Sequence, residues 1–182
     1  MFDQYTIFGT PNPVSEADLA TAEAQLNLRF PTGYRAFVTK FGKGILGDDH
    51  LNLTYEEMMQ NPEKYDDDES TGSEIRVYTP ADILDTADGV EAWRERITKY
   101  WFWNDGADVL SKDKAVECVV FADTTVGDEI IFHPSQPDRI YILPRDEETI
   151  YAVEGGLPGV IEWMFSSGTL YSSFTARCFK PD

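Results

Sequence analysis

Cysteine and histidine are scarce in this sequence, which contains two of each: Cys118, Cys178, His50 and His133. Two cysteines do not make a disulfide framework in a chain of 182 residues, and Cys118 lies in an apolar run typical of the protein core. His50 follows Asp48 and Asp49, but a metal site there would need a further ligand from elsewhere in the chain. The sequence therefore predicts no metal site and no other cofactor.

Long apolar runs are also missing. No stretch approaches the ~20 apolar residues that a membrane-spanning helix needs, and residues 1–13 lack the basic start and apolar segment of a secretory signal. We therefore expect a cytoplasmic protein that does not bind membranes. The hydrophobic share of 42% and aromatic share of 13% are ample for the core of a single domain over residues 1–182.

Positive charge is the third deficit. The chain has 15 Lys and Arg but 33 Asp and Glu, which gives a net charge of −18. Residues 46–95 hold 15 acids against three bases, and residues 123–154 hold eight against two, so these two segments carry the whole imbalance. Phosphates and anionic lipids would repel such a chain, which argues against nucleic-acid and membrane partners. The natural complement is a basic protein.

Catalytic sequence patterns are absent as well. The chain contains no G-x-S-x-G nucleophile motif, no P-loop and no dinucleotide fingerprint. The acidic run Asp66-Asp67-Asp68-Glu69 lacks the spacing of a calcium loop, which leaves a solvated loop or a partner contact as its interpretation. The sequence thus predicts a binding protein and not an enzyme, with a small hydrolase or metal-dependent enzyme kept as an alternative.

Periodicity predicts an α+β fold with a central, mainly antiparallel sheet, two N-terminal helices and a closing C-terminal helix. The predicted helices cover residues 15–26, 31–41 and 155–167, with another starting at Thr79-Pro80. Four consecutive strands are predicted within 116–153, and shorter ones at 45–46, 51–53 and 75–78. Residues 168–182 are expected to be a tail. The expected core contains Tyr34, Phe37, Phe41, Val119, Phe121, Ile131 and Ile142.

Carboxylates and exposed aromatics are the candidate contacts for a basic partner. Trp101 and Trp103 would share one face if their segment were a strand, and buried core is the competing interpretation. The interpretation of the acidic segments as merely solubilising also remains open. The predicted partner-binding residues are Asp48, Asp49, Asp66, Asp67, Asp68, Glu69, Trp101, Trp103, Asp128 and Glu129.

Two regions resemble a known family. Leu26-Asn27-Leu28, followed by Pro31, Tyr34 and Phe37 and then Gly42 and Gly44, resembles the opening signature of the SUKH superfamily, which is named partly for fungal cell-wall regulators. The run from Gly127-Asp128 to Phe132 resembles a later strand motif of the same family. The resemblance covers residues 14–45 and 116–166, whereas 46–115 carry no recognised signature. One departure is Gly42-Lys43-Gly44, where the family usually has Asn-Gly-Gly.

The resemblance implies an α+β fold and a role as an immunity protein that binds and blocks a bacterial toxin. Many such toxins are nucleases, and nucleases tend to be basic because they hold phosphates. An acidic blocker would therefore complement them, in agreement with the charge map. The alternative implied by the fungal relatives is a cytoplasmic scaffold or regulator.

Overall fold

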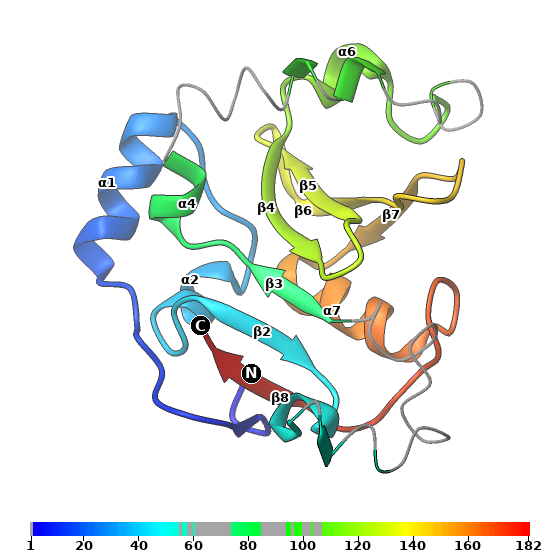
Figure 1. Cartoon of the computed structure of the whole chain (residues 1–182). Coiled ribbons are helices and arrows are strands. Elements are labelled where there is room, and N and C mark those ends of the chain that lie inside the picture. The colour runs from blue at the N-terminus through cyan, green and yellow to red at the C-terminus, as the bar shows by residue number, and fades with distance from the viewer. Residues whose placement is uncertain are drawn as a thin grey trace.

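The computed structural model of the chain describes residues 2–54, 56–57, 60, 74–84, 94–95, 97–99, 103 and 107–182. It is an α+β fold built on one eight-stranded sheet with the order β1-β8-β2-β3-β4-β5-β6-β7 (Figure 1). Every neighbouring pair is antiparallel except β1 and β8, which run parallel. The strands are β1 Thr6–Ile7, β2 Gly44–Gly47, β3 Ile75–Val77, β4 Val119–Thr124, β5 Glu129–His133, β6 Gln136–Leu143, β7 Tyr151–Glu154 and β8 Cys178–Pro181.

The first predicted helix is confirmed as α1, Glu16–Leu26. The Ser15 hydroxyl accepts a hydrogen bond from the Asp18 backbone N–H at 3.1 Å, which satisfies one of the unpaired amides of the first turn. Asn27 ends the helix in the left-handed conformation, at φ 50°. The second helix, α2 Tyr34–Val38, begins later than the predicted Pro31, because Gly33 lies at φ 81°, outside the helical region.

The predicted run of antiparallel strands within 116–153 is confirmed as β4 to β7. A bulge between Val120 and Ala122 interrupts the pairing of β4 with β5. Of the seven predicted core residues, six are fully or almost fully buried and Val119 is half-buried. The closing helix is confirmed as α7, Gly156–Ser166, which packs on β6 and β7.

The segment predicted as a tail contains strand β8, which lies between β1 and β2 in the sheet. Phe179 of β8 is fully buried, and its ring lies 4.7 Å from that of Phe41 and 5.9 Å from that of Phe37. The strand is held by residues more than a hundred positions away, so the local pattern of four residues did not reveal it.

The middle of the chain follows the prediction in part. Strand β3 and helix α4, Pro80–Leu84, occur where expected, and the Thr79 hydroxyl lies 2.7 Å from the Asp82 carboxylate. The predicted strand at 51–53 is wrong, because residues Asp49–Asn52 form the 3-10 helix η1, capped by Asp48. The Asp48 carboxylate accepts a hydrogen bond from the Asp49 backbone N–H at the start of this turn. The short helix α6, Lys112–Ala115, precedes β4.

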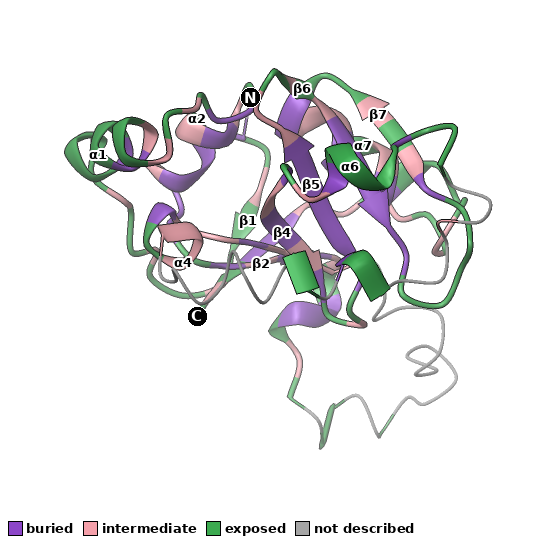
Figure 2. Cartoon of the chain, turned by 90° about the horizontal axis from the view of Figure 1, so that it is seen from above, coloured by how far each residue is buried: buried purple, intermediate pink, exposed green. Residues whose placement is uncertain are grey.

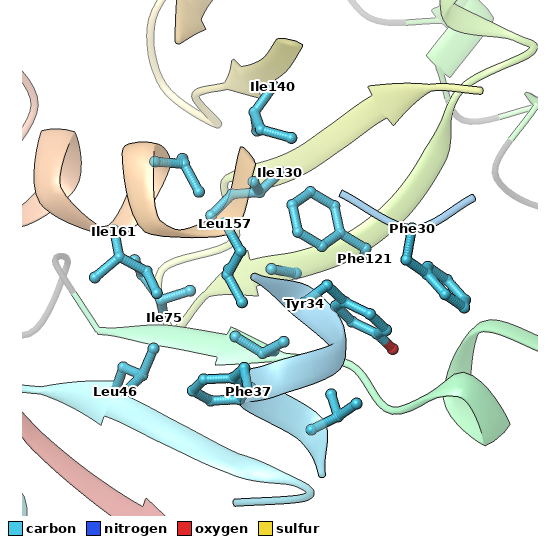
Figure 3. Packing of buried hydrophobic residues seen from close by; sticks show 14 of the residues in the cluster. Phe30, Tyr34, Phe37, Leu46, Ile75, Phe121, Ile130, Ile140, Leu157 and Ile161 are labelled. Carbon is cyan, nitrogen blue, oxygen red and sulfur yellow. The ribbon is translucent and has the colours of Figure 1, made fainter. Parts of the chain in front are cut away.

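Apolar side chains cover the two faces of the sheet unequally. One face carries the main core, where Tyr34 and Phe37 of α2 and Leu157 and Ile161 of α7 meet side chains from the sheet (Figure 3). On the opposite face a smaller cluster joins Ile131 and Tyr141 to Ile97, Leu110, Ala115 and Cys118. The buried residues follow the strands and the inner sides of the helices (Figure 2). Among the described residues, no helix has the length and apolar character to cross a membrane.

Candidate protein-binding surface

The antiparallel pairing brings several loops to one end of the sheet. Leu46, next to the end of β2, and Thr124, the last residue of β4, both lie opposite Ile75, the first residue of β3. The last residue of β6, Leu143, lies opposite the first residue of β5, Glu129. The loops after β2, β4 and β6 therefore emerge on the same side of the sheet. The chain before β8 joins them there, because Cys178 pairs with Gly47 (Figure 1).

We call this side the acidic end, defined by residues 48–54, 74, the β4–β5 turn (125–128), the β6–β7 loop (144–150) and the C-terminal segment (167–177). Asp49 is exposed, as are Asp146, Glu147 and Glu148 in the β6–β7 loop. The only lysine or arginine residues in these segments are Arg145 and Arg177. Four strand spacings of ~4.8 Å separate the chain that follows β2 from the chain that follows β6, so the acidic end is roughly 19 Å wide.

The structure places the predicted contact residues in different environments. Asp49 is exposed at the acidic end, and the half-buried Asp48 uses its carboxylate to accept a hydrogen bond from the Asp49 backbone N–H at 2.6 Å. Trp103 is half-buried against the smaller apolar cluster, and its indole N–H donates to the Ile97 carbonyl oxygen at 2.7 Å. The other predicted residues of the middle segment, Asp66, Asp67, Asp68, Glu69 and Trp101, lie outside the described residues.

Asp128 and Glu129 are at the acidic end but inside the fold, with 2% and 6% of their surface exposed. Asp128 accepts hydrogen bonds from the hydroxyl groups of Thr124 and Tyr171 and from the backbone N–H of Arg145. A carboxylate used in this way is not available to a partner. Glu129 is buried to a similar extent, so neither side chain lies on the exposed surface of the acidic end.

The pair formed by His50 and Glu74 was not anticipated from the sequence. The Nε2 atom of His50 lies 2.6 Å from Oε1 of Glu74, and both side chains are largely buried. The hydrogen bond with Glu74 raises the pKa of His50, helped by the charges of Glu74, Asp48 and Asp49. Among the described residues, no three His, Cys, Asp or Glu side chains are grouped so as to hold a metal ion.

An ion pair in the middle of the sheet neutralises a further acid of the second acidic segment. The guanidinium of Arg76 on β3 donates two hydrogen bonds, of 2.9 and 2.8 Å, to Asp123 on the neighbouring β4. The Tyr78 hydroxyl donates to the same carboxylate at 2.8 Å. Burial, together with the charge of Asp123, raises the pKa of Tyr78. Asp123 is thus balanced locally, whereas the loops of the acidic end hold more acids than bases.

Fold and surface together define an α+β protein with helices packed against a mostly antiparallel sheet and acidic loops gathered at one end of it. A family model described as the SMI1 / KNR4 family (SUKH-1) matches residues 13–163, which is most of the chain. The protein therefore belongs to this family, and the resemblance seen in the two sequence signatures is confirmed. The family includes toxin immunity proteins. A search of curated proteins found no match.

Proposed function

We propose that this protein is a cytoplasmic immunity protein that binds and neutralises a cognate, basic toxin of the nuclease type. Family membership supports this proposal, since immunity proteins of the SUKH group bind their cognate toxins. The observation that carries the basic character of the partner is the gathering of acidic loops at one end of the sheet. The two segments with the entire charge imbalance, 46–95 and 123–154, both contribute to that end.

Charge gathered in this way affects how fast a partner associates. Like charges on one surface repel each other and so destabilise the fold. Solubility alone would not require the acids to be concentrated on one surface in this way. A basic partner would be attracted from a distance, and its association rate would exceed the ~10⁵–10⁶ M⁻¹s⁻¹ of unsteered protein pairs. Salt would remove this gain, because the Debye length falls to about 3 Å at 1 M ionic strength.

The proposal requires that a toxin is encoded beside this gene. The test measures association with that toxin, purified with an inactivating substitution, over a range of salt concentrations. One variant carries Asp146→Asn, Glu147→Gln and Glu148→Gln in the β6–β7 loop. A second replaces Asp66, Asp67, Asp68 and Glu69 by Asn and Gln. Both should associate more slowly than wild type at low salt and converge with it at high salt, because they keep side-chain size and lose only charge.

The matched control is Asp108→Asn, Asp113→Asn and Glu117→Gln, which removes three exposed acids from the segment before β4. This segment lies toward the opposite end of β4. The association rate of the control variant with the toxin should therefore stay close to that of wild type. Absence of binding to the neighbouring toxin would overturn the proposal. Equal rates for wild type and the β6–β7 loop variant at every salt concentration would overturn the assignment of the contact to the acidic end.

A further inference from the structure

Three chain segments of the acidic end meet at one buried carboxylate, that of Asp128. Its Oδ2 atom accepts hydrogen bonds from the Thr124 hydroxyl, at 2.8 Å, and from the Tyr171 hydroxyl. Its Oδ1 atom accepts from the Arg145 backbone N–H at 2.9 Å. Thr124 ends β4, Arg145 begins the exposed part of the β6–β7 loop, and Tyr171 lies in the C-terminal segment. One side chain thus joins three segments that are far apart in the sequence.

Further hydrogen bonds reinforce this arrangement. The Asp128 backbone N–H donates to the Thr124 hydroxyl at 3.0 Å, and the Gly127 N–H donates to the Thr124 carbonyl oxygen at 3.0 Å. The Arg145 guanidinium donates to the Val126 carbonyl oxygen at 3.1 Å. The β4–β5 turn and the β6–β7 loop are therefore tied by both backbone and side-chain contacts.

The energetics of this contact favour a fixed geometry. A buried carboxylate is tolerated only when hydrogen bonds replace its water, and Asp128 receives three from protein donors. Burial and the Asp128 charge together raise the pKa of Tyr171, so its hydroxyl remains a donor. If Asp128 lost its acceptor atoms, the buried Thr124 hydroxyl and the partly buried Tyr171 hydroxyl and Arg145 N–H would lose their partner.

We infer that Asp128 is a positioning residue for partner binding. It holds the β4–β5 turn, the β6–β7 loop and the C-terminal segment as one prearranged surface without touching the partner itself. On that surface the acids of the β6–β7 loop attract a basic protein. The hydroxyl-rich stretch 166–173 (Ser-Ser-Gly-Thr-Leu-Tyr-Ser-Ser) supplies adaptable hydrogen-bonding groups beside them. Binding loses less conformational entropy when the loops are already ordered, which slows dissociation. This inference rests on the proposed function.

Tyr171→Phe is the sharpest test, because it removes one hydrogen bond to Asp128 and changes no charge. In the free protein, amide hydrogen exchange in 169–173 should be about tenfold faster than in wild type. Dissociation from the inactivated neighbouring toxin should also be faster, while the salt dependence of association should be unchanged. Asp128→Ala should extend the faster exchange to residues 145–149, because it also removes the acceptor of the Arg145 backbone N–H.

Tyr34→Phe is the matched control, because the buried Tyr34 hydroxyl donates to the Tyr78 carbonyl oxygen at 2.7 Å, away from the acidic end. It should lower the free energy of unfolding but leave unchanged both the amide hydrogen exchange of the loops and the rate of dissociation from the toxin. Equal dissociation rates for Tyr171→Phe and Tyr34→Phe would overturn the positioning role. Failure of the proposed function is recognised separately, since the wild-type protein would then not bind the neighbouring toxin at all.

Discussion

The imidazole of His50 lies against the carboxylate of Glu74, with 2.6 Å between Nε2 and Oε1, and only 6% and 13% of the two side chains are exposed. The contact fastens η1, which follows β2, to the residue that precedes β3. Beside it Leu51 is buried over Gly47. The contact therefore helps to determine how the chain leaves the sheet at the acidic end. No local pattern in the sequence indicates this contact, because Glu74 lies 24 positions from His50.

The stability contributed by this pair should depend on pH. The pKa of His50 is raised in the folded state, mainly by the hydrogen bond with Glu74, so the folded protein binds more protons than the unfolded chain near and above the ordinary His pKa of about 6.5. The contribution is fully present below that value and is lost as pH rises through the higher folded pKa. Denaturant unfolding should show that His50→Gln destabilises the protein more at about pH 5.5 than at about pH 8.5.

Glu74→Gln should show the same trend, because it removes the charge that stabilises the imidazolium. His133→Gln serves as the control, since it leaves the His50–Glu74 pair in place. This variant should keep the pH-dependent stability that the pair contributes. A destabilisation by His50→Gln that grows with rising pH would contradict the assigned sign.

Phe37→Ala should destabilise the protein by about 3–5 kcal/mol, the usual effect of emptying a core aromatic site. Phe37 is fully buried, and its ring contacts those of Phe2, Phe41 and Phe179. Ile7→Ala is a suitable comparison, because Ile7 is 39% exposed on the edge strand β1 and should contribute less. Urea unfolding of both variants measures the difference. A loss below about 1 kcal/mol for Phe37→Ala would contradict its place in the core.

Gly42→Ala should destabilise the protein more than Gly168→Ala. Both glycines have positive φ, 72° and 64°, so an added side chain strains the backbone by roughly 1–2 kcal/mol in each case. At Gly42 the new Cβ atom would also lie 1.8 Å from the Asn12 carbonyl oxygen, whereas nothing lies within 4 Å at Gly168. Asn12 forms a β-bridge with Gly42, so this backbone cannot move away without losing it. Equal free energies of unfolding would show that the Asn12 contact has no influence.

The sequence alone determined most of the elements of this protein. Helix α1, the run of strands β4 to β7 and the closing helix α7 follow from hydrophobic periodicity and from the capping residue Ser15, because these signals lie within a few neighbouring residues. The family signatures and the two acidic segments can also be read directly from the order of the amino acids.

Only the tertiary structure decided which residues share a surface. Strand β8 and the His50–Glu74 pair depend on partners that are distant in the chain, and no local pattern contains that information. Asp128 and Glu129 look like surface acids in the sequence, yet both side chains are buried where β5 begins beside β4 and β6. Asp128 is stable there because Thr124, Arg145 and Tyr171 satisfy its carboxylate. The same pairing directs separate acidic loops to one end, since strands that alternate in direction return every second connection to the same side.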